Sequence, residues 1–187
     1  MQNAYLSGAS VYLRPLEKSD AAFLASALNN SQVTRTLATI GPINVASEEQ
    51  WLSTVNQSPG DLVLGIALRA GERLIGACGL HRIDYRNRHA ELGIVIGDPS
   101  EWGKGYGTEA VRLLVGHAFE TLNLNRVQLH VYETNPAGIR AYEKVGFRRE
   151  GVMRQFAFRE GRYWDAHLMA ILREQWTGVS RETDRPR

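Results

Sequence analysis

The chain has 187 residues, of which 43% are hydrophobic and 22% are charged, and its formal net charge is +2. These values predict one hydrophobic core, and the near balance of charge argues against a nucleic-acid-binding protein. No run of about 18 apolar residues predicts a membrane span. The single cysteine, Cys78, excludes an intramolecular disulfide and is expected in the core. We therefore expect a cytoplasmic protein with one domain at residues 1–176 and a disordered C-terminal tail at residues 177–187.

The N-terminal part combines regular elements with one irregular segment. Residues Val11 to Leu16 predict a short strand, and Ser19 or Asp20 is expected to cap the helix that follows. Residues 32–45 have an irregular pattern, so this segment is either a loop that contacts substrate or a plain connection between helices. A capping box that begins at Ser47 then predicts the start of a short helix.

Three antiparallel strands are predicted in the middle of the chain. Residues 62–69 and 73–84 are rich in β-forming residues and flank a short turn centred on Gly71, which favours a hairpin. Residues 90–96 predict the third strand, and Gly97 with the residues after it ends that strand. The three strands therefore lead directly into a glycine-rich loop.

This loop carries Gly103, Gly105 and Gly107 at every second position, and a helix is predicted from about Lys104 to Leu122. Glycines let backbone N–H groups approach a ligand closely. The first turn of a helix adds unpaired N–H donors and the positive end of the helix dipole. The loop therefore predicts a binding site for a phosphate or a pyrophosphate.

Two common phosphate-binding motifs fit this loop poorly. A P-loop requires Ser or Thr directly after Gly-Lys, but Gly105 follows Lys104 here. The dinucleotide-binding pattern matches in one frame, from Gly105 to Ala110, but a long helix occupies the positions that should lead to an acidic residue. A glycine-rich turn without a ligand is the least favoured interpretation, because a lysine and a helix accompany the glycines.

The C-terminal part predicts a strand, a helix and a closing hairpin. Residues 126–132 alternate between apolar and polar side chains, as a strand with unlike faces should. Asn135 before a proline predicts the N-terminal cap of a helix, and Gly146 predicts its C-terminal cap. Residues 151–158 and 163–172 predict the hairpin. The whole order predicts a mixed α/β (α+β) domain with at least one parallel pair of strands.

The segments Trp102 to Ala110 and Lys144 to Phe147, with Asn135 and Tyr142, resemble the GNAT superfamily of acetyl-CoA-dependent N-acetyltransferases. The resemblance covers essentially the whole chain and is strongest for the branch that includes ribosomal-protein N-terminal (alanine/serine) and spermidine acetyltransferases. It implies a single domain with a mixed, mostly antiparallel sheet of about seven strands, helices on both faces, and a splayed parallel pair that binds acetyl-CoA. Trp102 stands where the superfamily has Gln or Arg, a departure that this branch shares.

The resemblance also assigns residues to the acetyl donor, acetyl-CoA. The backbone of Ile94, Val95 and Ile96 is expected to pair with the amides of the pantetheine arm, like an added strand. Asn135 is expected to contact the same arm in addition to capping its helix. The loop and the first helical turn are expected to bind the pyrophosphate. The cofactor-binding residues assigned there are Trp102, Gly103, Lys104, Gly105, Tyr106, Gly107 and Thr108.

Two further residues are implied to act in catalysis. Glu91 begins the strand beside the thioester site and is the candidate base, directly or through a water; alternatively, it is an ordinary strand carboxylate paired with Arg88 or His89. Tyr142 matches the family tyrosine that protonates the departing thiolate; alternatively, it is a core residue. The histidines lack the spacing of metal ligands, so we predict no metal.

The resulting hypothesis is an enzyme that transfers an acetyl group from acetyl-CoA to a primary amine by direct attack in a ternary complex. The acceptor is expected to be a protein N-terminus or a small amine such as a polyamine, with no nucleic acid and no membrane as partner. The family also allows a homodimer through the last two strands. The alternative is a CoA-binding sensor or scaffold without turnover, and the presence of both Glu91 and Tyr142 favours the enzyme.

Overall fold

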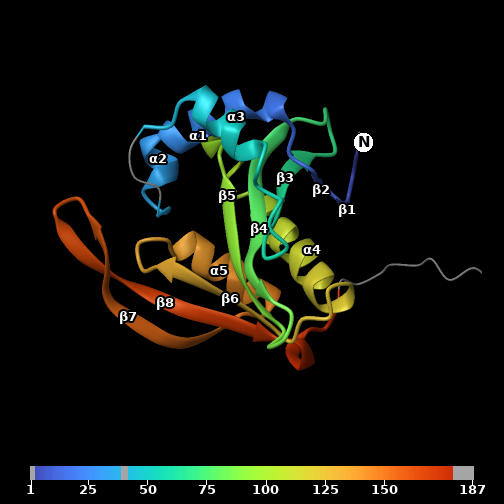
Figure 1. The fold of residues 1–187 in the computed structure, drawn as a ribbon. Helices are drawn as coiled ribbons and strands as arrows, with labels where there is room; N and C mark the ends of the chain where they lie inside the picture. Colours follow the sequence, from blue (N-terminus) through green and yellow to red (C-terminus); the bar gives the residue numbers. More distant parts are fainter. Residues whose placement is uncertain (1–2, 39–41, 179–187) are drawn as a thin grey trace, which may run out of the picture.

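The structure is a computed structural model that describes residues 3–38 and 42–178, and it is built on one eight-stranded sheet (Figure 1). The strands lie in the order β1-β2-β3-β4-β5-β6-β8-β7, and within the described ranges only β5 and β6 pair in parallel. Their bounds are β1 Leu6–Ser7, β2 Val11–Arg14, β3 Leu62–Leu68, β4 Leu74–Asp84, β5 His89–Ile96, β6 Arg126–Tyr132, β7 Arg148–Arg159 and β8 Arg162–Leu172. The predicted mixed, mostly antiparallel sheet is confirmed, with β1 as an additional short strand beside β2.

Helices cover both faces of the sheet (Figure 1). Helices α1, α2 and α3 lie together on one face, and α4 and α5 lie on the other. Their bounds are α1 Ala21–Asn29, α2 Ser31–Thr34, α3 Val45–Leu52, α4 Tyr106–Glu120 and α5 Pro136–Val145. None of these described helices is long and apolar enough to cross a membrane.

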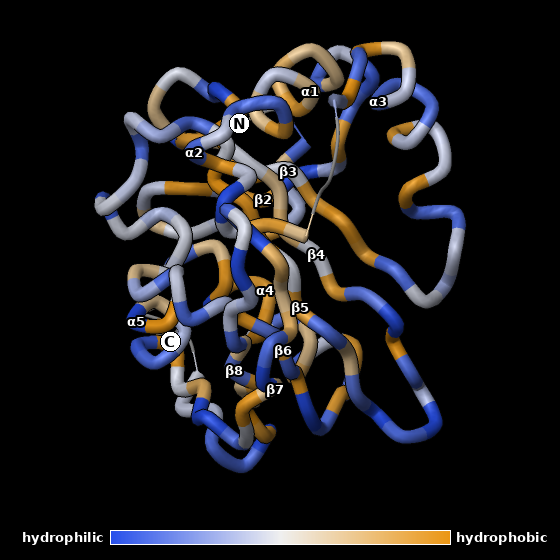
Figure 2. Tube along the Cα trace, turned by 90° about the vertical axis from the view of Figure 1, so that its left-hand side faces the viewer, coloured by the Kyte–Doolittle hydropathy of each residue, from blue (hydrophilic) through white to orange (hydrophobic). Residues whose placement is uncertain are grey.

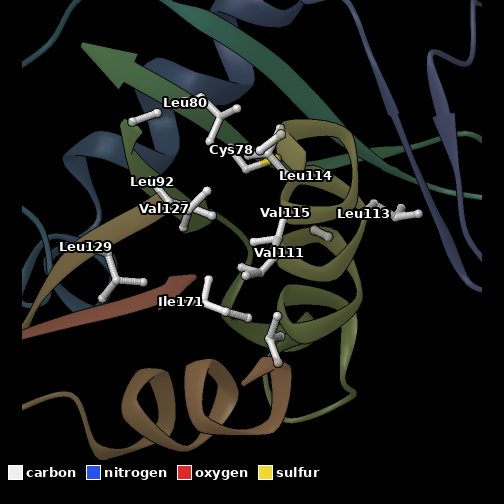
Figure 3. Packing of buried hydrophobic residues seen from close by; sticks show 14 of the residues in the cluster. Cys78, Leu80, Leu92, Val111, Leu113, Leu114, Val115, Val127, Leu129 and Ile171 are labelled. Carbon is white, nitrogen blue, oxygen red and sulfur yellow. The ribbon is translucent and has the colours of Figure 1, made fainter. Parts of the chain in front are cut away.

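The main hydrophobic core lies between the sheet and the α4–α5 face. Val111, Leu114 and Val115 point from α4 toward the strands, where Leu92 and Val127 face them (Figure 3). All five side chains are buried. The apolar stripe predicted for this helix is therefore the face that packs on the sheet, and burial of such side chains contributes about 1.5–3 kcal/mol each. A smaller cluster on the opposite face consists of Leu24, Leu74 and Ala77.

Cys78 lies within the main core and is 2% exposed. Burial raises the pKa of its thiol to about 12, so the thiol stays protonated at neutral pH. Cys78 is therefore a core residue, as predicted.

Figure 2 shows hydrophobic stretches along the central strands and hydrophilic residues in the turns that join them.

The parallel strands β5 and β6 separate partway along their length. Their pairing runs from His89 with Arg126 to Glu91 with Gln128 and stops there. Beyond this point β5 continues beside β4, and β6 continues beside β8. Each strand thus keeps its outer neighbour while its inner edge has no strand partner. The predicted splayed parallel pair is present.

One predicted helix start differs from the structure, and at another the predicted cap residue stands in place but makes no capping hydrogen bond. Helix α3 begins before the capping box predicted at Ser47, because the side chain of Asn44 accepts the N–H of Ser47 at 2.8 Å and is the actual cap. Asp20 precedes α1 but makes no side-chain cap; its carboxylate instead accepts two hydrogen bonds from Arg14, each 2.8 Å long. In both cases the hydrogen bond involves a residue that the sequence pattern did not indicate: Asn44 caps α3, and Arg14 binds Asp20.

Two sequence predictions fall partly outside the described residues. The predicted tail begins at residue 177, and residues 179–187 lie outside the description, so the domain boundary and the tail stay predictions. The irregular segment 32–45 contains part of α2, and residues 39–41 of it also lie outside. Its two interpretations, as a substrate loop or a connection, therefore both stand.

Glu48 on α3 is a buried carboxylate whose replacement should stabilise the protein. The residue is 6% exposed, and burial raises the pKa of its carboxyl above the ordinary value of 4.5. The ionised form therefore disfavours folding at neutral pH, and this penalty disappears once the carboxyl is protonated below 4.5. We expect Glu48→Gln to raise the melting temperature at neutral pH and to lose that advantage in acid.

Thermal unfolding of Glu48→Gln at neutral and acidic pH measures this effect. Glu49→Gln is the matched control, because Glu49 pairs with Lys18 at 3.1 Å on the more exposed side of the same helix. That pair lies near the surface, so its removal should change the melting temperature little. A Glu48→Gln protein that melts at or below the wild-type temperature at neutral pH would contradict the expectation.

Candidate active site

The open edge of β5 presents the backbone groups of alternate residues. The N–H of Gly97 donates to the carbonyl oxygen of Ile75 on β4 at 2.8 Å, so the odd-numbered residues of β5 turn their backbone groups toward β4. The even-numbered Ile94 and Ile96 turn theirs toward the gap. The backbone of Val95 therefore faces β4, which narrows the predicted backbone pairing with a ligand to Ile94 and Ile96.

The glycine loop after β5 has the backbone shape that only glycine adopts readily. The φ angles are +75° at Gly103 and +89° at Gly105, both in the left-handed region. A Cβ atom built at either glycine would meet no atom within 4 Å. The loop is thus an open concave stretch of backbone rather than a packed turn.

Helix α4 begins directly behind this loop. It starts at Tyr106, later than the predicted start at Lys104, because the left-handed Gly105 stands at the N-cap position. The N–H groups in the first turn of a helix have no partner within the helix. In α4 these donors belong to Tyr106, Gly107 and Thr108. These donors and the helix dipole are the features on which the predicted anion site depends, and anion binding there stays a prediction.

Trp102 fixes the end of the open edge. Its indole Nε1 donates to the carbonyl oxygen of Ile96 at 2.9 Å, and the residue is 44% exposed. The residue that departs from the superfamily motif therefore holds the strand end and the glycine loop together. Its predicted contact with a cofactor stays a prediction.

A cluster of charged residues at the glycine loop is connected by hydrogen bonds. Glu101 is buried and accepts a hydrogen bond from Nζ of Lys104 at 2.8 Å and another from the guanidinium of Arg73. Arg73 also donates to Asp98 at 2.6 Å. The hydrogen bond from Lys104, followed by the one from Arg73, holds the pKa of Glu101 below its ordinary value. The ammonium of Lys104 is therefore bound by a carboxylate. The group of this residue that remains for a ligand is its backbone N–H.

Replacement of Glu101 should destabilise the protein at neutral pH. Because its pKa is lowered in the folded protein, its ionised form favours folding fully above the ordinary value of 4.5, and this contribution is lost as the pH falls through the lowered value. We expect Glu101→Gln to lower the melting temperature at neutral pH and to approach the wild type in acid. Glu174→Gln, an exposed carboxylate after β8, is the control. An unchanged melting temperature in Glu101→Gln would show that these hydrogen bonds carry no stability.

Both predicted caps of α5 are confirmed. The side-chain oxygen of Asn135 accepts the N–H of Gly138 at 2.9 Å, and Gly146 closes the helix with a φ of +113°. A Cβ at Gly138 would lie 2.6 Å from the side-chain nitrogen of Asn135, so the glycine leaves room for the cap. The same Asn135 is free to use that nitrogen for a ligand, as no described residue bonds to it.

Tyr142 lies on α5 and packs against the main core. Its ring centre is 5.9 Å from that of Phe147, and burial raises the pKa of its hydroxyl to about 12. Within the described ranges, no hydrogen bond reaches this hydroxyl. The tyrosine therefore keeps its proton at neutral pH and has an unused donor.

Glu91 is the last residue of β5 that pairs with β6. One carboxylate oxygen accepts from Nη1 of Arg82 at 2.7 Å, and the other lies 3.1 Å from Nδ1 of His130 on β6. The alternative partners predicted for Glu91 are wrong, because Arg88 binds the loop after α4 and His89 faces the end of β4. Neither actual partner was predictable from the local sequence pattern, because both come from neighbouring strands.

Glu91 and Tyr142 lie on opposite faces of the sheet. Side chains alternate along β5, and Val95, on the same side as Glu91, packs in the cluster beneath α1. Tyr142 belongs to the core beneath α4. The open strand pair lies between these two faces, and no contact joins the two side chains.

The long β7–β8 hairpin bounds the Glu91 side of the sheet. Its tip reaches the segment after α2, where Arg159 donates to the carbonyl oxygen of Leu37 at 2.8 Å and Glu160 pairs with Arg35 at 3.1 Å. Figure 1 shows the hairpin extending beyond the sheet toward α2.

Among the described residues no group of three or more His, Cys, Asp or Glu could hold a metal ion.

The fold is an α/β domain with a splayed parallel pair of strands and a glycine loop followed by a helix N-terminus at the end of one of them. Residues 10–148 match the family model described as the acetyltransferase (GNAT) domain. The chain therefore belongs to the GNAT family, and it is an N-acetyltransferase of that family. The family and the fold predicted from the sequence are both confirmed.

Relatives of known structure and sequence agree with this membership. The N-acetyltransferase p20 of Bacillus licheniformis is 30% identical over 173 residues, which cover 89% of this chain and 94% of the relative. The putative ribosomal N-acetyltransferase YdaF of Bacillus subtilis is 37% identical over 105 residues, or 56% of this chain and 57% of YdaF. The crystal structure of spermidine N-acetyltransferase from Vibrio cholerae in complex with CoA and spermine has a TM-score of 0.80 at 29% identity, covering 88% of this chain and 96% of that one.

Proposed function

We propose that this protein transfers an acetyl group from acetyl-CoA to a primary amine by direct attack in a ternary complex. The observation that carries the proposal is the end of β5–β6 pairing at Glu91 and Gln128, with the N-terminus of α4 behind the open stretch. An open strand edge accepts an amide-bearing chain, and a helix N-terminus behind glycines accepts a pyrophosphate. Acetyl-CoA combines these two chemical features.

The residues present fit this donor. The loop at Gly103 and Gly105 has open space around both Cβ positions, and the first N–H groups of α4 have no partner within the helix. The backbone of Ile94 and Ile96 would pair with the amides of the pantetheine arm, and the side-chain nitrogen of Asn135 would donate to the same arm. When bound, acetyl-CoA supplies an activated acyl group and a thiol leaving group.

The acid and base functions fall on opposite faces of the open pair. Amide formation requires removal of a proton from the amine and protonation of the departing sulfur. Tyr142 keeps its proton at neutral pH and would donate it to the sulfur. Glu91, which accepts from Arg82 and His130, would supply negative charge on the side where the amine loses its proton.

The proposed acceptor is a primary amine, either a small polyamine or the N-terminus of a protein. The structural relative from Vibrio cholerae is a spermidine N-acetyltransferase, and YdaF carries a ribosomal assignment, so both kinds of amine are represented among the relatives. The tip of the β7–β8 hairpin contacts the segment after α2, and this contact lies on the side where the acceptor would enter. A homodimer through the last two strands stays a prediction.

Thermal unfolding with acetyl-CoA and release of free thiol with an amine panel test the proposal. Saturation at 100 times the dissociation constant should add about 2.7 kcal/mol of stability. Spermidine, spermine and a peptide that begins with serine form the panel, and one of them should support turnover. An unchanged melting temperature with acetyl-CoA, together with a rise caused by NAD or ATP, would refute the proposal. Stabilisation without turnover on a broad panel would instead favour a CoA-binding sensor.

A further inference from the structure

His130 stands beside the open stretch of the parallel pair. It follows Gln128, the last residue of β6 that pairs with β5, and alternation places it on the same face as Glu91. Its side chain is 26% exposed, so it is neither a core residue nor a free surface histidine. The proposed reaction gives this residue no role, yet it lies where the acceptor amine would arrive.

The hydrogen bond to Glu91 fixes the tautomer of His130. Nδ1 of the ring lies 3.1 Å from the carboxylate oxygen, and a carboxylate can only accept. The proton of the neutral imidazole therefore sits on Nδ1, and Nε2 carries the lone pair. Nε2 forms no hydrogen bond with any residue in the described ranges. The ring is thus held with a basic nitrogen that is free to accept a proton.

The surroundings of His130 single out Glu91 as its charged partner. The ring of Phe156 lies 5.8 Å away between centres, and Leu168 of β8 stands opposite in register, so both neighbours are apolar. The titratable and charged groups on this face of the sheet and its adjoining turns include Glu91, Arg82, His81, Asp61, Arg126, Glu150, Tyr132 and Arg159. Of these, only Glu91 bonds to the imidazole in the described part of the chain.

Glu91 itself is poorly placed to take the proton. One of its oxygens is bound by Arg82 at 2.7 Å and the other by His130. Both carboxylate oxygens are therefore already engaged by donors, whereas Nε2 of His130 is the open acceptor of the pair in the described part of the chain. Histidine, in contrast, is the side chain whose ordinary titration lies nearest to neutral pH, which suits a general base.

We propose that His130 accepts the proton of the acceptor amine through Nε2, and that Glu91 is the positioning residue that orients the ring and stabilises its charged form. This inference rests on the proposed acetyl transfer. The carbon–nitrogen bond forms as the carbon–sulfur bond breaks, and the amine proton moves to Nε2 and then to water. Tyr142 gives its proton to the sulfur and regains one from water, so atoms and charge balance.

Profiles of kcat against pH test this assignment. The acceptor probe is spermidine or a peptide that begins with serine, whichever the wild type uses faster, and the donor is saturating acetyl-CoA. His130→Gln should lower kcat about 10²-fold and remove the fall of kcat at acidic pH. Glu91→Gln should lower kcat only about ten-fold and keep the acidic fall, because the base is still present and only the carboxylate that orients its ring is lost. The same acceptor is used throughout, so its own ionisation affects all profiles alike.

Rescue and a matched control separate a chemical role from a structural one. His130→Ala should regain activity when free imidazole is added, which loss of packing could not produce. His89→Gln should keep the wild-type profile, because His89 faces Asp84 at 3.8 Å at the closed end of the same strand pair. Melting temperatures of all variants, with and without acetyl-CoA, report folding and donor binding.

Three results would overturn the assignment. An acidic fall that is lost in Glu91→Gln but kept in His130→Gln would make Glu91 the base. Loss of the fall in His81→Gln would assign the role to the histidine of β4. Wild-type turnover with an unchanged His130→Gln profile would remove this inference alone, whereas a wild type with neither stabilisation by acetyl-CoA nor turnover would remove the proposed function as well.

Discussion

Gly105→Ala is expected to weaken acetyl-CoA binding roughly 10- to 100-fold, which corresponds to the loss of one or two charge-assisted hydrogen bonds. Gly105 is the N-cap residue of α4 and has a φ of +89°. An alanine there would disfavour this left-handed conformation by about 1–2 kcal/mol. The first free N–H groups of α4 would then turn away from the anion site, and the added methyl group would stand in the glycine loop.

Isothermal titration with acetyl-CoA and thermal unfolding of Gly105→Ala measure the two parts of this effect. Gly71→Ala is the matched control, because Gly71 has a φ of +78° and open space around its Cβ position but lies in the β3–β4 turn. The control should lose a similar amount of stability from backbone strain and keep its full affinity. Equal affinity in the two variants would show that the loop at Gly105 does not bind the donor.

Local patterns in the sequence were sufficient to predict the elements that flank the gap. The strict alternation of residues 126–132 gave the bounds of β6, and the caps Asn135 and Gly146 gave those of α5. These signals are local, since a strand period and a cap depend only on neighbours within a few residues. The glycine loop was predictable for the same reason, because Gly105 and the helix behind it are adjacent in the chain.

The environment of the candidate base could not be predicted in this way. The contact between Glu91 and His130 joins residues on two strands, and it exists only because the register of β5 and β6 sets Glu91 opposite Gln128. Arg82 reaches Glu91 across a second strand pair. Neither register can be read from the pattern of a single strand, because register depends on how two strands pair. A shift of one residue in this pairing would turn every side chain to the other face. The sequence therefore indicated Glu91 but not the histidine that it holds.

The exclusion of the Val95 backbone from the predicted pairing with acetyl-CoA also depends on how two strands pair. The family resemblance implied that three successive strand residues contact the donor, whereas an antiparallel neighbour takes the backbone groups of every second one. The bond from Gly97 to Ile75 fixes which set is taken, and it leaves the backbone of Ile94 and the N–H of Ile96 for a ligand, while the carbonyl oxygen of Ile96 accepts from Trp102. The set could be assigned only once β4 had been placed beside β5.

Tyr142→Phe is expected to lower kcat about 10²-fold, as for the loss of a general acid, with little change in the affinity for acetyl-CoA. The hydroxyl makes no hydrogen bond within the described ranges, and the ring packs beside Phe147 with 5.9 Å between centres. Phenylalanine keeps that packing, so the melting temperature at neutral pH should change little. The variant thus separates the proton donor from the core residue, the two roles that the sequence left open for Tyr142.

The pH dependence of this loss distinguishes Tyr142 from His130. Burial raises the pKa of Tyr142 to about 12, so the hydroxyl holds its proton throughout the range in which activity is measured. The ratio of wild-type to Tyr142→Phe rates should therefore be constant across neutral pH, whereas the ratio for His130→Gln should vary with pH. Tyr85→Phe is the control, because Tyr85 is 55% exposed in the β4–β5 turn and should leave kcat unchanged. A Tyr142→Phe enzyme with the wild-type kcat would make Tyr142 a core residue and leave protonation of the sulfur to water.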